Sequence, residues 1–98
     1  MTDKIFRFKS ESFVLREADN EMVLVPLTND IVDMTNIMIL NEVASDIIKL
    51  LDGKTSLKKI SEILLEKYEI DKEVLENDII QFIKRVGERR MVEEVVNN

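Results

Sequence analysis

Hydrophobic and polar positions divide the chain into a first half patterned like strands and a second half patterned like helices. Two short runs rich in β-forming residues flank Asp19 and Asn20, which tolerate the left-handed backbone angles of a tight turn. We therefore expect a hairpin with strands at about 12–17 and 21–27. Pro26, the only proline, cannot donate a ladder hydrogen bond, so it belongs near a strand end or on an edge.

A third strand is expected after the polar residues that follow this hairpin. Apolar residues return at 31–32 and again at 37–40, which favours a strand that ends near Leu40. Asp33 or Asn36 would mark a bend or bulge between the two apolar runs.

Three helices are expected in the second half, because apolar residues there recur at i, i+3, i+4 and i+7. Asn41 is placed to cap the first helix, and Asp52-Gly53 to end it, with the glycine supplying a left-handed exit. Thr55 and Ser56 precede the second helix as capping residues.

The third helix is the longest, roughly 72–88 after a cap at Asp71, and its apolar face is broader than one contact requires. One stripe of this face consists of Leu75, Ile79, Phe82 and Val86. Ile80 and Ile83 continue beside the stripe, about one residue step (roughly 100°) around the helix. Either the helix is central and packs on two neighbours, or one flank of the face lines a groove that a partner fills.

The order of three strands followed by three helices predicts an α+β fold, in a single domain of 98 residues with its core at about 12–92. Apolar residues make up 45% of the chain and charged residues 35%, which is typical of a globular protein. The first residues carry charges where a signal peptide needs an apolar stretch. No apolar run approaches the ~18 residues of a membrane span, so the expected location is the cytoplasm.

Most catalytic chemistry is excluded by what the chain lacks. It contains no His and no Cys, so the commonest general base, the best soft nucleophile and the usual zinc ligands are absent. The two glycines, Gly53 and Gly87, do not build a phosphate-cradling loop. We therefore expect a protein that is no enzyme and that binds no metal or cofactor.

Three stretches within residues 13–92 resemble the PqqD-like family, small proteins named for a component of pyrroloquinoline quinone biosynthesis. The first is the second strand with its proline at 22–26. The second is the run 33–42, in which a strand leads into a Leu-Asn pair, followed by Ala44, Ile48 and 50–53. The third is the start of the second helix at 55–60 together with the end of the long helix at 89–92. None of these stretches is catalytic, and their order and spacing carry the likeness.

The resemblance implies a winged helix-turn-helix with a three-stranded antiparallel sheet followed by three helices, which agrees with the order of elements above. It also implies a peptide-recognition element, which binds the leader segment of a ribosomally made precursor peptide. Such domains present the precursor to a modifying enzyme, often a radical S-adenosylmethionine protein. The leader extends the sheet along an exposed edge, while its side chains enter a groove beside a helix.

Carried onto this sequence, the resemblance implies a peptide-binding site between the third strand and the third helix. The exposed edge would consist of Ile37, Met38, Ile39 and Leu40. On the helix, Ile80 and Ile83 would form the apolar wall of the groove, with Gln81 or Lys84 at its rim. The alternative places the two isoleucines in the core and the two polar residues on the solvated surface.

Two other functions stay open at this point. A winged helix-turn-helix can place a helix in the major groove of DNA. The net charge of −6 and the acidic first half of the third helix, however, offer a poor surface to phosphates, so we expect no nucleic acid partner. The second alternative is a homodimer, in which the exposed edge and the wide third-helix face pair with another copy.

Overall fold

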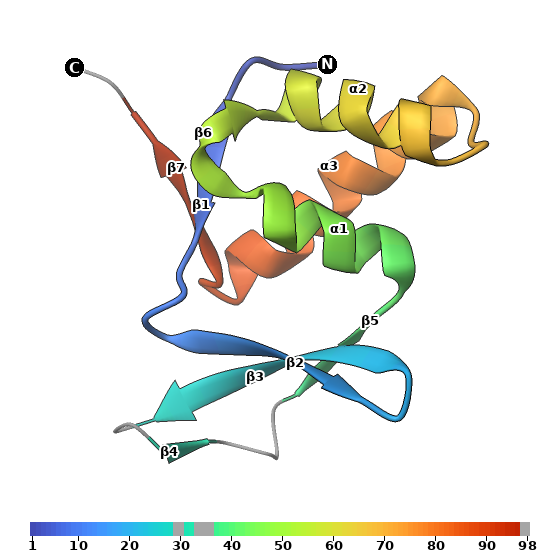
Figure 1. Cartoon of the computed structure of the whole chain (residues 1–98). Coiled ribbons are helices and arrows are strands. Elements are labelled where there is room, and N and C mark those ends of the chain that lie inside the picture. Colours follow the sequence, from blue (N-terminus) through green and yellow to red (C-terminus); the bar gives the residue numbers. More distant parts are fainter. Residues whose placement is uncertain (29–30, 33–36, 97–98) are drawn as a thin grey trace.

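The computed structural model describes residues 1–28, 31–32 and 37–96, and these contain two sheets and three helices (Figure 1). In chain order the elements are β1 (Ile5–Phe8), β2 (Phe13–Ala18), β3 (Glu21–Thr28), β4 (Ile31–Val32), β5 (Met38–Leu40), α1 (Glu42–Leu50), β6 (Asp52–Ser56), α2 (Leu57–Lys67), α3 (Lys72–Glu88) and β7 (Val92–Val95). The α+β class and the three expected helices are confirmed.

The first sheet, which we call the wing sheet, contains β2, β3, β4 and β5 and lies below the helices in Figure 1. β2 and β3 form the expected hairpin, in register from Phe13 opposite Pro26 to Ala18 opposite Glu21. Asp19 and Asn20 both have positive φ, 50° and 69°, which suits the tight turns that follow the twist of a hairpin.

The third strand of the wing sheet is shorter than expected. β5 pairs with β3 antiparallel, from Met22 opposite Leu40 to Leu24 opposite Met38, and β4 pairs with the far end of β3. The bend expected at Asp33 or Asn36 lies outside the described residues.

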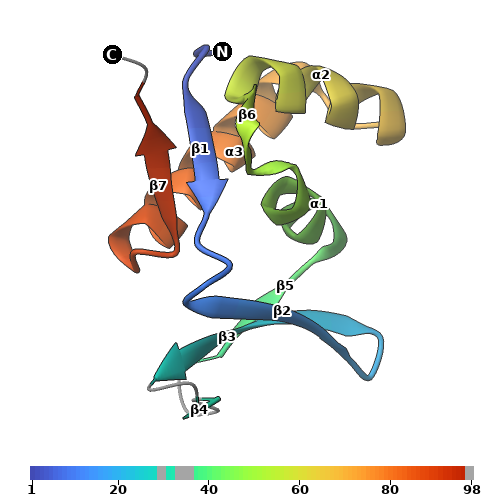
Figure 2. The same ribbon diagram turned by 60° about the vertical axis from the view of Figure 1, so that its left-hand side comes forward.

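A second sheet, the terminal sheet, was not predicted. Its order is β6-β1-β7, so the strand near the start of the chain lies between one strand from its middle and one from its end (Figure 2). Backbone N–H groups of Phe8 and Leu57 donate to the carbonyls of Leu51 and Lys4 at 2.9 Å each. This sheet therefore joins strands from near both ends of the chain to β6, the strand between α1 and α2.

Three of the four expected capping residues act as caps, whereas Thr55 donates to the Asp52 carboxylate and does not cap α2. The side chains of Asn41, Ser56 and Asp71 accept hydrogen bonds from backbone N–H groups in the first turns of α1, α2 and α3, at 2.8, 3.1 and 2.9 Å. Each cap satisfies a donor that the helix itself leaves free. These local signals explain why the starts of the helices could be predicted.

The predicted end of the first helix at Asp52-Gly53 is wrong, because α1 ends at Leu50 and Leu51 is its C-cap. Asp52 instead starts β6, where its carboxylate accepts hydrogen bonds from the backbone N–H groups of Lys54 and Thr55. Gly53 does have the expected positive φ, 80°. The glycine supports this turn within the terminal sheet and not a helix exit.

The two glycines are expected to respond to alanine with opposite signs. Gly53→Ala forces a side chain into a left-handed backbone and should lower the free energy of unfolding by about 1 kcal/mol. Gly87→Ala should raise it by about 0.5 kcal/mol, because Gly87 is helical and nothing lies within 4 Å of the added Cβ. Urea denaturation of both variants tests the pair, and shifts of the same sign would contradict it.

One hydrophobic core joins the three helices to the wing sheet. Its fully buried members include Leu24, Ile47, Ile60, Leu64, Leu75, Ile79 and Val86. The predicted stripe of α3 faces this core, so the long helix is central to the fold.

A polar cluster ties α1 to the end of α2. The Asp46 carboxylate accepts hydrogen bonds from Lys67 Nζ at 2.6 Å and from the Tyr68 hydroxyl at 2.5 Å. Burial alone would raise the pKa of Asp46, but these two hydrogen bonds outweigh it and lower the pKa below its usual value. The charged form of Asp46 is therefore the form that the folded state favours.

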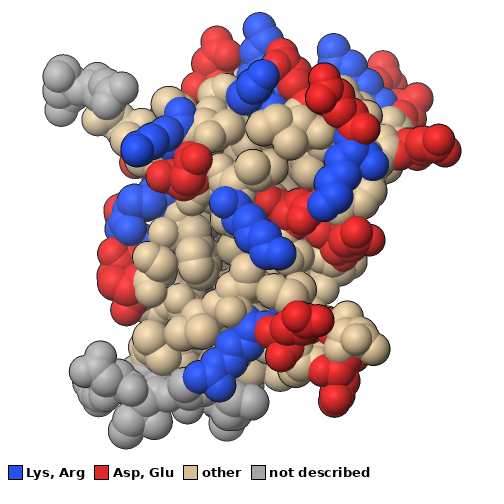
Figure 3. Space-filling view, viewed as in Figure 1, with Lys and Arg blue, Asp and Glu red and all other residues tan. Residues whose placement is uncertain are grey.

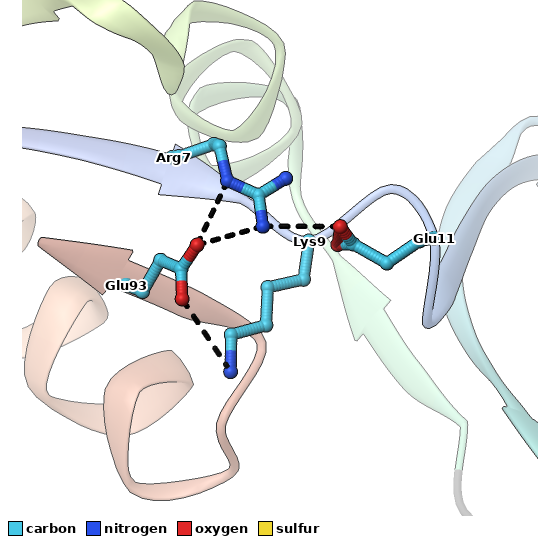
Figure 4. Close-up of polar contacts among 4 residues, drawn as sticks. All are labelled: Arg7, Lys9, Glu11 and Glu93. Atoms are coloured by element: carbon cyan, nitrogen blue, oxygen red, sulfur yellow. Dashed lines mark hydrogen bonds and ion pairs between the residues drawn. The ribbon is translucent and has the colours of Figure 1, made fainter. Parts of the chain in front are cut away.

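A second polar cluster fixes the junction of the two sheets (Figure 4). Arg7 of β1 donates to the Glu93 carboxylate of β7 through Nε and Nη2 at 2.9 and 2.7 Å, and to Glu11 through Nη2 at 3.0 Å. Lys9 Nζ lies 4.0 Å from the second oxygen of Glu93. The hydrogen bond from Arg7 lowers the pKa of Glu11. The cluster therefore links β7 to the connection that leads into the wing sheet.

Candidate functional site

β5 is a border strand of the wing sheet. It pairs with β3 on one side, and within residues 1–28, 31–32 and 37–96 no strand pairs with its other side. Met38 and Leu40 are buried, whereas Ile39 between them is 57% exposed. A strand with a free side carries unpaired N–H and C=O groups, so β5 can accept a further strand.

A groove of about 620 Å³ lies beside β5, between α1 and α3. Its lining consists of Ile39, Leu40, Asn41, Val43, Ala44, Ile47, Asp78, Gln81, Phe82, Lys84, Arg85 and Glu88. The groove therefore adjoins a strand of the wing sheet that has a free side.

The floor of the groove is apolar. α1 contributes Val43, Ala44 and Ile47, and α3 contributes Phe82. Ile47 and Phe82 are also members of the core, while Val43 and Ala44 are half-buried. A guest side chain that covers this floor gains roughly 25 cal/mol for each Å² of apolar surface removed from water. The floor therefore favours an apolar side chain.

The rim of the groove is polar and comes mainly from α3. Asp78, Gln81, Lys84, Arg85 and Glu88 all line the groove and are exposed. They recur three or four residues apart, which places them along one side of the helix. Such a rim can form hydrogen bonds and ion pairs with a guest without the cost of burying a charge.

The structure brings half of the predicted site residues together. Ile39, Leu40, Gln81 and Lys84 line the groove. Ile37, Met38, Ile80 and Ile83 do not line it.

The residues outside the groove divide into two pairs. Met38 and Ile83 are buried members of the core. Ile37 and Ile80 are exposed, 37% and 51%, but neither reaches the lining of the groove. The prediction that Ile80 and Ile83 form the apolar wall of the groove is therefore corrected, and Phe82 takes that place on α3.

The correction follows from the helix geometry. Ile80 precedes Phe82 by two residues, so its side chain points roughly 200° away around α3. The groove lies on the other flank of the apolar stripe, among charged residues that look like ordinary solvated surface in the sequence. The contribution of Val43 and Ala44 was also missed, because their helical spacing matched a buried face.

A smaller depression of about 370 Å³ lies between the end of β1, β2 and α1. Two of its charged residues are already engaged, since Arg7 binds Glu93 and Glu11, and the carboxylate of Asp52 caps its own turn. The groove beside β5 is larger and has an exposed rim, so we take it as the candidate site.

The surface charge is mixed on the face that Figure 3 draws. Basic and acidic side chains alternate over the helices, and uncharged surface gathers lower down, toward the wing sheet. This face therefore carries no continuous positive field of the kind that a nucleic acid backbone requires.

Residues 1–28, 31–32 and 37–96 contain no cluster of His, Cys, Asp and Glu side chains that could hold a metal ion. Over the same residues, none of the helices combines the length and the apolar character needed to cross a membrane.

Together the fold and the groove define a winged helix-turn-helix-like α+β domain in which β5, one of the border strands among the described residues, lies beside the groove on the long helix. The chain belongs to the PqqD family, since the family model described as coenzyme PQQ synthesis protein D matches residues 21–92.

A solved structure supports the same fold. The chain is similar to a structure titled TbiB1 in complex with the TbiA(beta) leader peptide, with a TM-score of 0.69 and 22% sequence identity. The match covers 89% of this chain and 94% of that chain. No curated protein matches the sequence.

Proposed function

We propose that this protein binds the leader segment of a ribosomally synthesised precursor peptide by strand addition to β5. The observation that carries the proposal is the free side of β5 directly beside an apolar groove. Membership of the PqqD family and the likeness to a structure that holds a leader peptide both support it.

The two features divide the work of binding. Main-chain hydrogen bonds to β5 give affinity that depends little on sequence, while the groove selects side chains. Along an added strand alternate side chains point to the same face. Every second residue of the guest therefore faces the floor made by Val43, Ala44, Ile47 and Phe82, and a single large apolar residue serves as the anchor.

In this proposal the protein is an adaptor without catalytic chemistry of its own, and it needs no cofactor. The bound leader leaves the remainder of the precursor free for a modifying enzyme. The resemblance to the PqqD-like family makes a radical S-adenosylmethionine protein the expected class of that enzyme. The cytoplasm, where precursor peptides are made, is the expected place of this encounter.

The proposal is tested by selecting peptides from a displayed random library against the full chain and mapping one selected peptide by NMR. We expect amide shifts at Met38–Leu40 of β5 and along the groove side of α3 between Asp78 and Glu88. Shifts confined to the terminal sheet, or no selected peptide at all, would contradict the proposed function.

A further inference from the structure

The charges on the groove side of α3 follow an order along the helix. Asp78 stands first, the neutral Gln81 follows one turn later, and Lys84 and Arg85 come next. Glu88 is the last charged residue of α3 that lines the groove. From Asp78 to Arg85 the helix rises roughly 10 Å. Along α3 the groove is therefore acidic at Asp78, neutral at Gln81, basic at Lys84 and Arg85, and acidic again at Glu88.

The two cations are not neutralised by neighbouring side chains. Glu88 stands four residues after Lys84 and three after Arg85, spacings at which opposite charges often pair on a helix. Among the described residues, however, the ion pairs within 4 Å involve neither cation. By contrast, Arg7 and Lys67 are each held by a carboxylate at 2.7 and 2.6 Å. Lys84 and Arg85 thus present their donors to whatever occupies the groove.

We infer that the groove reads charge as well as apolar surface, and that it selects a leader with a carboxylate on one side of its apolar anchor. Resting on the proposed function, the inference names the peptide class that the site accepts. The carboxylate binds Lys84 and Arg85, while Asp78 disfavours an acidic residue at the other end and favours a basic one.

The spacing of the two charged positions follows from the geometry. A strand rises about 3.3 Å per residue, and only every second residue faces the groove. Charged residues two positions before and two positions after the anchor therefore span about 13 Å, which long side chains match to the roughly 10 Å along α3. The apolar anchor falls between the two charged residues, over Phe82 and Ile47. Lys84 and Arg85 lie in the C-terminal half of α3, where the helix dipole stabilises cations.

The inference is tested with a charge reversal and a matched control. Lys84→Glu combined with Arg85→Glu reverses the basic part of the groove. Lys58→Glu combined with Lys59→Glu makes the same change in net charge on a neighbouring exposed pair of α2, outside the groove. Peptides are selected from a displayed random library against each full-length protein, and one wild-type-selected peptide is compared with its Glu→Lys version by fluorescence anisotropy.

With the wild type and the α2 control, we expect selected peptides with an acidic residue beside an apolar anchor. The Glu→Lys peptide should bind these two proteins about tenfold more weakly, as expected when partly exposed ion pairs are lost and replaced by like charges. The groove variant should prefer the Glu→Lys peptide and keep the same anchor.

Two outcomes overturn the inference in distinguishable ways. Anchored peptides without a charge preference, or a preference that survives in the groove variant, overturn the charge-reading role and leave the proposed function standing. Failure to select any peptide with the wild type overturns both. Circular dichroism of the variants shows whether each protein is folded when it is compared.

Discussion

Replacing Ala44 by tryptophan is expected to weaken peptide binding about a hundredfold, which is the loss typical of a central interface pocket. Ala44 lies on the floor of the groove and is half-buried, on the side of α1 that faces α3. An indole at this position occupies the space that the guest's apolar anchor would fill. Because the added group extends into the groove, the core beneath it keeps its packing.

The matched control is Ala18→Trp, at the only other alanine of the chain. Ala18 is exposed at the end of β2, which β3 separates from β5. We expect this variant to bind a selected peptide as the wild type does, measured by fluorescence anisotropy, with both variants melting near the wild-type temperature. Unchanged binding by a folded Ala44→Trp variant would place the guest outside the groove.

Features that depend on neighbouring residues could be predicted from the sequence. The caps at Asn41, Ser56 and Asp71 and the turn at Asp19-Asn20 each rest on interactions within a few residues. The apolar stripe of α3 was also read correctly, because its spacing reports burial directly. The wing hairpin and all three helices follow from these signals.

The terminal sheet could not be predicted, because its strands are short and meet only in the folded chain. β7 reads Val-Glu-Glu-Val, and β1 contains Arg7 among its apolar residues. Neither segment shows a run of apolar residues or an alternation long enough to distinguish a strand from the charged surface segments of this chain. The pairing joins residues near both ends, as Ile5 lies opposite Val95, and no local signal encodes such a contact.

Four of the eight residues predicted for the site line the groove, among them Ile39, Gln81 and Lys84. That a peptide binds there stays a prediction. Ile80 and Ile83 were predicted as the apolar wall, because the apolar face of α3 is broader than one contact requires. In the structure the floor is shared with the core, and α3 contributes Phe82 from the edge of its buried stripe.

Removal of β1 is expected to lower the free energy of unfolding strongly. A chain of residues 10–98, which lacks β1, is expected to lose several kcal/mol of its free energy of unfolding, a large part of the 5–15 kcal/mol typical of a domain. β1 is the central strand of the terminal sheet, so its removal leaves β6 and β7 without a shared partner. Phe6 and Phe8, which pack against the core, are lost with it.

Urea denaturation of the 10–98 chain beside the full chain measures this loss. A peptide of residues 1–9 added at high concentration serves as the control, since it can restore β1 without the covalent link and should recover part of the stability. The family match begins at residue 21, so a boundary drawn there would predict no loss. An unchanged denaturation midpoint in the 10–98 chain would show that the wing sheet and the helices fold independently of the terminal sheet.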